Sequence, residues 1–267
     1  MTTVILLYCT GTNVTDMQFL YIDLMALVPL SVLQARTGSH GELTKDRPTN
    51  SLFYFPVLLS VILAGAIQAA FQIYFAITVK NQPFFIPVDP TVDTFEYDNP
   101  SYEGTVLFMV SNFQYLATCT AFNKSRPFRL PVHTNLPFVI SLGLLVVLGT
   151  LIVFLPDGSF LATFFCLLPF KDETTGESYY DYRAWIAVGI LLNSILTFTA
   201  EKMIVGPITE WADQRTERKK QAYFHAQMHA WKTGEENGNG EFFDDDKFMR
   251  FVEKDTLDGS FTPTHKA

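Results

Sequence analysis

Five long apolar segments decide what this chain can fold into. They span residues 16–33, 52–78, 105–122, 136–155 and 184–205 of the 267-residue sequence. At 1.5 Å per residue, a helix of about 18 residues measures about 27 Å, close to the roughly 30 Å hydrocarbon core of a bilayer. The sequence therefore predicts an all-α membrane protein, a polytopic helix bundle with five complete transmembrane helices.

Charge is distributed as a membrane protein requires. The chain has 46 charged residues, and 21 of them lie after residue 205, so charge is scarce over the first three-quarters of the sequence. Such a composition excludes an ordinary soluble domain, and a net charge of −8 without a basic stripe argues against a nucleic-acid partner. We expect a transmembrane region over residues 1–205, in contact with the lipid bilayer, and a polar tail over residues 206–267.

The start of the chain is apolar but too short to cross a membrane. Residues 1–9 would make about 13 Å of helix, and a short turn follows before the first full segment. We interpret residues 1–9 as a half-span, which suggests that the chain is a piece of a longer membrane protein.

Basic residues in the loops predict the orientation. Loops 34–51 and 123–135 carry six Lys and Arg residues and loops 79–104 and 156–183 carry three. By the positive-inside rule the first pair of loops and the tail are cytosolic. The two outer loops also hold ten acidic residues, Glu103 and Asp157 among them, and three basic residues, Arg183 among them. We expect these acids to be solvated, and the alternative is a negative surface that concentrates cations.

Most polar side chains within the segments have a structural interpretation. Segment 105–122 is the least apolar, so its polar side must face other helices. Gln68 and Gln72 lie four residues apart on one face, and Asn112, Gln114 and Asn193 are further amides. Hydrogen bonds between helices account for all of them.

Asp23 is different, because it lies well inside the first full segment without a Lys or Arg in the same segment. An Asp at the centre of a membrane helix costs about 2.5 kcal/mol or more, so such acids are functional by default. Asp16, seven residues earlier, and Phe19 are predicted to share its face, and Pro29 is expected to open the backbone nearby. Carboxylates lined by aromatic and apolar surface suit an organic cation, and the alternative is a carboxyl that serves packing alone.

Motifs of soluble catalysis are absent from the sequence. No nucleotide-binding glycine loop, zinc-protease motif or nucleophile elbow occurs. His225 and His229 lie four residues apart, but two imidazoles do not make a metal site, and we expect an exposed helix there. We therefore predict no catalytic residue, no metal and no cofactor in this chain.

Several stretches resemble one family of membrane pumps. These are TNVTDMQFLYIDL, DRPTNSLFYFPVLLS, NPSYEGTVLFMVSNFQYL, AFNKSRPFRLPVHTNLPF and NSILTFTAEKMI, in this order along the chain. They are similar to the last membrane helices of type V P-type ATPases, in the subgroup of polyamine-transporting pumps of late endosomes and lysosomes. The resemblance covers roughly residues 3–205, and the tail carries no specific match.

The resemblance implies helices six to ten of a ten-helix core, with residues 1–9 as the end of the fifth helix. Asp23 then corresponds to an acid that contacts the polyamine, with Asp16 and Phe19 on the route from the lumenal side. The phosphorylation loop and the nucleotide domain have no counterpart here, so ATP and Mg belong to the rest of the pump. The expected function is polyamine transport together with that remainder, and the alternative is a non-catalytic scaffold or a truncated regulator that associates with a full-length pump.

Overall fold

A computed structural model gives the structure of the chain. It describes residues 2–39, 41, 54–88, 100–123, 129–171, 176 and 178–232, with side chains up to residue 225. The chain divides into two compact units, Met1–Val205 and Gly206–Ala267. Lys45, Arg47, Lys124 and Arg126, which support the predicted orientation, lie outside the described residues.

Apart from isolated β-bridges, the regular secondary structure among the described residues of the first unit is helical, which confirms the all-α prediction. The helices are α1 (Thr2–Cys9), α2 (Asp16–Leu20), η1 (Tyr21–Leu27), α3 (Val28–Ala35), α4 (Phe55–Lys80), α5 (Tyr102–Ala121), η2 (Val132–Thr134), α6 (Leu136–Val153), α7 (Phe160–Phe164), α8 (Tyr180–Ala200) and η3 (Glu201–Val205). Helices η1 and η3 are π-helical and η2 is a 3₁₀ turn. The described part of the second unit contains α9 (Gly206–Lys232).

Four stretches of helix in the described residues are long and apolar enough to cross a membrane. They are α2–η1–α3 together, α4, α6 and the stretch that begins with α8. The first three match predicted segments to within a few residues, and the fourth, Tyr180–His225, contains the predicted segment 184–205. Together they make the chain a polytopic membrane protein. The fifth predicted span, residues 105–122, is helix α5 and does not meet the same measure of apolarity.

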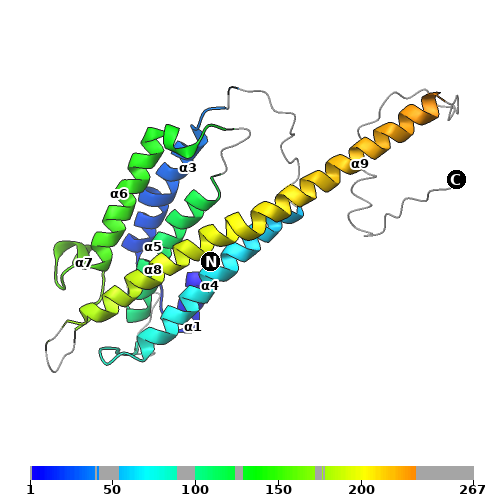
Figure 1. The fold of residues 1–267 in the computed structure, drawn as a ribbon. Coiled ribbons are helices and arrows are strands. Elements are labelled where there is room, and N and C mark those ends of the chain that lie inside the picture. Colours follow the sequence, from blue (N-terminus) through cyan, green and yellow to red (C-terminus); the bar gives the residue numbers. More distant parts are fainter. Residues whose placement is uncertain are drawn as a thin grey trace. The chain divides into compact units, whose positions relative to one another are not determined.

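The position of α5 explains its composition. It packs against α4, α6 and α8 (Figure 1). Fourteen of its 20 residues are buried, Ser111, Asn112 and Gln114 among them. A helix surrounded by other helices does not need the apolar surface that lipid demands, because its polar groups find partners within the protein. The predicted inward orientation of its polar side is confirmed.

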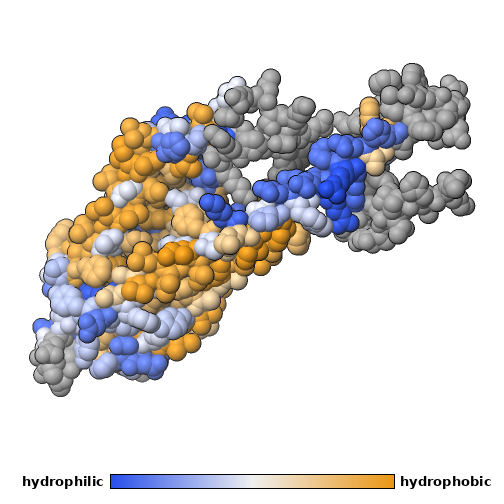
Figure 2. All heavy atoms as spheres, in the orientation of Figure 1, coloured by the Kyte–Doolittle hydropathy of each residue, from blue (hydrophilic) through white to orange (hydrophobic). Residues whose placement is uncertain are grey.

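The surface of the first unit is apolar, in contrast to the partly polar interior around α5. Figure 2 shows apolar side chains over much of the helical bundle. Exposed large apolar residues include Val61 and Ile62 on α4, Leu144 on α6 and Leu191 on α8. An apolar surface of this extent, wrapped around a partly polar interior, is what a lipid environment requires.

The half-span and the turn after it fold against the bundle. Helix α1 packs on α4 and α5, and its Leu7 is fully buried with Val14, Ala76 and Leu107. In the turn, Gly11 adopts a positive φ of 70°, a conformation open to glycine. The backbone N–H of Thr12 donates to the carbonyl of Leu7, so the turn closes the end of α1.

Aromatic residues from distant parts of the sequence pack together at one end of this bundle. The ring of Phe84 lies 5.1 Å from that of Phe170 and 5.5 Å from that of Tyr182. Phe84 is 3% exposed and Phe170 is fully buried, so they form part of the core. The segment that leads from α7 to α8 is therefore anchored to the loop after α4.

Candidate functional site

The helix that carries Asp23 changes its geometry at that residue. The chain is α-helical from Asp16, π-helical over Tyr21–Leu27 and α-helical again from Val28. The backbone N–H of Val28 donates to the carbonyl of Asp23, five residues earlier, as in a π turn. Pro29 follows immediately and has no N–H to donate. The backbone opening that the sequence predicts near Pro29 is thus a π-helical turn, a feature frequent at functional sites.

One side of this helix is anchored in the bundle. Tyr21 is 2% exposed, and its ring makes edge-on contacts with those of Phe108 and Phe165 at 5.8 Å and 5.3 Å. The Tyr21 hydroxyl accepts a hydrogen bond from Asn112 at 3.3 Å. The Gln18 amide donates to the carbonyl of Phe165 at 2.8 Å. These contacts fix the rotation of the helix and therefore decide which residues face outward.

The other side carries all three residues that the sequence singled out. Asp16, Phe19 and Asp23 are exposed in the chain. The carboxylate of Asp23 has no hydrogen bond or ion pair among the described residues. Leu27, which α-helical spacing would place on the same face, is only half-exposed. The helix therefore presents two carboxylates and an aromatic ring on a side that α4–α8 leave uncovered.

This arrangement is costly in a membrane unless something pairs with it. An isolated carboxylate in hydrocarbon favours a cation, a hydrogen-bond donor or water beside it. The carbonyls of a π turn add further acceptors nearby, since some lack the usual α-helical donor. The site is suited to a cation that approaches from the uncovered side.

The amides of α4 and α5, in contrast, have the structural role predicted for them. The Gln72 amide donates to Gln114 at 2.7 Å, and the Gln114 amide donates to the carbonyl of Gln68 at 3.1 Å. The Gln68 amide also donates to the hydroxyl of Thr118. These bonds join α4 to α5 along their buried sides. Asn193 on α8 is also buried.

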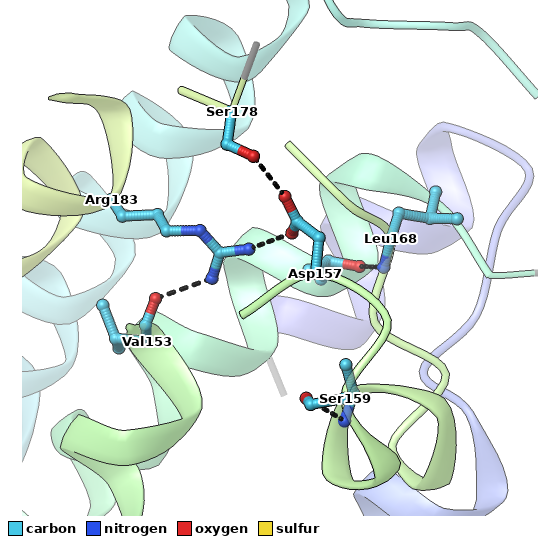
Figure 3. Close-up of polar contacts among 8 residues, drawn as sticks. Val153, Asp157, Ser159, Leu168, Ser178 and Arg183 are labelled. Atoms are coloured by element: carbon cyan, nitrogen blue, oxygen red, sulfur yellow. Dashed lines mark hydrogen bonds and ion pairs between the residues drawn. The ribbon is translucent and has the colours of Figure 1, made fainter. Parts of the chain in front are cut away.

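Sequence reasoning missed an ion pair between a buried arginine and a partly buried aspartate at one end of α8 (Figure 3). Arg183 donates to Asp157 at 2.6 Å and to the carbonyl of Val153 at 2.8 Å. Ser178 donates to the second oxygen of Asp157 at 3.0 Å. The Arg183 guanidinium also lies 4.9 Å from the centre of the Phe170 ring. Arg183 is 4% exposed and pairs with Asp157, so this acid is not simply solvated, in contrast to the expectation from the sequence.

A second acid expected in solvent is buried as well. Glu103, in the first turn of α5, is 5% exposed and lies 3.8 Å from the ammonium group of Lys80 at the end of α4. No sequence signal links either pair, because the partners lie more than 20 residues apart in loops and helix ends. Among the described residues, no group of three or more His, Cys, Asp or Glu side chains could hold a metal ion.

Comparison with known proteins gives related pumps. The chain is 42% identical over 153 residues to the polyamine-transporting ATPase 13A2 of Mus musculus, covering 56% of this chain and 13% of that protein. It is 28% identical over 219 residues to the vacuolar cation-transporting ATPase YPK9 of Saccharomyces cerevisiae, covering 82% of this chain and 14% of that protein. The human polyamine-transporting ATPase 13A3 is 27% identical over 223 residues, with 75% of this chain and 17% of that protein covered.

The chain thus spans less than a fifth of the length of these relatives. No protein-family model matches it. The shared segment includes membrane helices, as the fold requires.

Proposed function

We propose that this chain, a homologue of type V P-type ATPases, supplies part of the membrane pathway by which such a pump moves polyamines. ATP hydrolysis and its Mg²⁺ would be supplied by pump domains that these residues do not include. Asp23 would pair with an ammonium group of the substrate inside the membrane. Asp16 and Phe19 would line its approach.

The observation that carries this proposal is the exposed position of Asp23 in a π-helical turn, where its carboxylate has no hydrogen bond or ion pair to any residue that the structure describes. A polyamine is a flexible chain of ammonium groups, and each one that enters the membrane loses its water. A carboxylate replaces that water by a charge-assisted hydrogen bond, and the aromatic ring of Phe19 contacts the methylenes. Elsewhere in the described bundle, the buried acid Glu103 and the partly buried acid Asp157 already have basic partners.

The test uses a complete pump in which this chain replaces the matching segment of the mouse relative. Polyamine-stimulated ATPase activity gives the half-maximal polyamine concentration. Asp23→Asn keeps the shape and removes the charge, at a cost of about 2–5 kcal/mol for a buried pair, so that concentration should rise about 30-fold or more. Asp16→Asn, nearer water, should cost about 1 kcal/mol, or about fivefold.

Two results would decide against the proposal. An unchanged half-maximal concentration in the Asp23→Asn pump would show that Asp23 does not contact the substrate. An equal rise in the half-maximal polyamine concentration for Asp23→Asn and Asp16→Asn would show that negative charge in general attracts the polyamine. Asp23 would then not be a specific binding residue.

We further propose that the chain lies in the late endosomal or lysosomal membrane with its tail in the cytosol. The loop after α3 would then be cytosolic and the loop after α4 lumenal. Single cysteines at Ser39 and at Asn81, both exposed, test this in a variant without the native cysteines. Labelling from opposite sides of the membrane is expected, and labelling of both from the same side would refute the topology.

A further inference from the structure

Helix α9 separates its charges onto opposite sides. With about 100° between successive residues, Trp211, Arg215, Arg218 and Lys219 fall within an arc of about 100°. The acids Glu210, Asp213 and Glu217 fall within about 60° on the opposite side. We call the first set, Trp211, Arg215, Arg218 and Lys219, the basic face. The separation gives a strongly basic surface to a chain whose net charge is −8.

Contacts within α9 sharpen this separation. The ammonium group of Lys220 lies 3.0 Å from the carboxylate of Glu217, so the basic residue on the acidic side is neutralised there. On the basic face the Arg215 guanidinium lies 5.4 Å from the centre of the Trp211 ring. Trp211 is 59% exposed, and Arg215 and Arg218 are exposed as well. Cationic and aromatic groups are thus presented together to the surroundings.

The place of α9 in the sequence suggests what it meets. It begins directly after Val205, the last residue of η3, and α8, η3 and α9 follow one another without a break. Helix α8 has 21 residues, or about 32 Å of helix, enough to cross the hydrocarbon core. The covalent chain therefore brings the first turns of α9 to the level of the lipid headgroups, where Trp side chains and basic residues are favoured.

We propose that the basic face of α9 binds anionic lipid headgroups of the bilayer that the preceding helix crosses. Arg215, Arg218 and Lys219 would pair with phosphate and carboxylate groups, and the ring of Trp211 would lie among the headgroups. Each basic residue near an anionic membrane surface strengthens adsorption about fivefold. The acidic side then faces the aqueous phase. This role is independent of polyamine transport and of Asp23.

The experiment uses the full chain in nanodiscs, with single cysteines in a variant that lacks the native ones. A fluorophore is attached at Ala222→Cys, an exposed position on the same side as the basic face, and quenched by lipids that carry a spin label in the headgroup. Gln221→Cys, also exposed but about 100° away around the helix, is the geometric control. Quenching is compared between phosphatidylcholine discs and discs with about one-third phosphatidylserine.

We expect anionic lipid to increase quenching at Ala222→Cys more than at Gln221→Cys, and salt to reverse the increase. Combining Arg215→Gln, Arg218→Gln and Lys219→Gln should abolish it. Lys220→Gln removes the same charge from the opposite side and should leave it nearly unchanged.

Three outcomes would overturn the proposal. Equal quenching in neutral and anionic discs would show that charge does not hold α9 to the membrane. An effect of Lys220→Gln as large as that of Arg218→Gln would show that the basic face is not special. Loss of the increase on addition of inorganic phosphate at constant ionic strength would identify a site for free phosphate instead of a membrane surface.

Discussion

Two membrane helices of this chain both carry polar groups and use them in opposite ways. Helix α5 buries its amides and hydroxyls against α4, α6 and α8, where Gln114 both accepts from Gln72 and donates to the Gln68 carbonyl. The helix formed by α2, η1 and α3 buries Gln18 and Tyr21 but leaves Asp23 exposed, with no hydrogen bond or ion pair in the described part of the chain. A polar residue in a membrane helix therefore has no fixed meaning. Its partners within the protein decide whether it stabilises the helix bundle or is available to bind a ligand.

The two helices should differ in how much their polar residues contribute to stability. Polar and closely packed residues of the interior should contribute to the free energy of unfolding, whereas Asp23 should not. Unfolding of the chain by sodium dodecyl sulfate, followed by circular dichroism, measures each contribution.

Breaking the ion pair of Arg183 with Asp157 should have the strongest effect. Arg183→Met keeps much of the side-chain volume but leaves Asp157 without its basic partner and the Val153 carbonyl without the donor from Arg183, at a cost of about 3–5 kcal/mol. The double variant Arg183→Met with Asp157→Leu should recover part of the loss, because no buried charge is left unpaired. If the double variant were as unstable as Arg183→Met, loss of packing on Phe170 would be the cause instead.

The second-largest loss of stability is expected where α4 and α8 pack most closely. A Cβ atom added to Gly189 on α8 would lie 2.2 Å from the ring of Phe75 on α4, which is fully buried. Gly189→Ala should therefore cost about 1–3 kcal/mol by overpacking. Gly143→Ala on α6 is the matched control, because a Cβ there meets nothing within 4 Å. It should be neutral or slightly stabilising in a helix interior. Equal effects at the two glycines would contradict the packing of α4 on α8.

The hydrogen bond between α4 and α5 should contribute less. A double-mutant cycle with Gln72→Leu and Gln114→Leu isolates it, and such bonds in membrane proteins average about 0.6 kcal/mol. The modest value follows because an amide freed in the membrane finds other partners. A coupling energy indistinguishable from zero would mean that the bond does not help hold the two helices together.

Asp23 should have the smallest effect on the chain by itself. Because Asp23 is exposed and makes no hydrogen bond or ion pair with another described residue, Asp23→Asn should change the free energy of unfolding by less than about 0.5 kcal/mol. The same change is expected to weaken polyamine stimulation of the complete pump strongly. A large loss of stability in the Asp23→Asn chain would show that Asp23 stabilises the helix bundle. It would then have the same structural role as the polar residues of α5.

Much of this fold follows from local sequence. The apolar runs define where the membrane helices lie, and the polar side of residues 105–122 shows that this helix needs protein neighbours. Pro29 and Asp23 together mark the irregular turn, although the sequence does not specify a π-helix. The isolated position of Asp23 among apolar residues identifies the candidate site without any knowledge of packing. These features depend on short stretches of chain, which is why a sequence displays them.

Other features arise only when distant segments meet. From sequence we expect Asp157 and Glu103 to be solvated, whereas the fold buries Glu103, partly buries Asp157 and gives each a basic partner from another element. The sequence around Gly189 does not show that the ring of Phe75 packs closely against this residue. The outward direction of Asp23 likewise depends on Tyr21 and Gln18, which dock on residues far along the chain. Sequence fixes which groups are costly to bury in a membrane, and tertiary packing alone determines which of them obtain a partner.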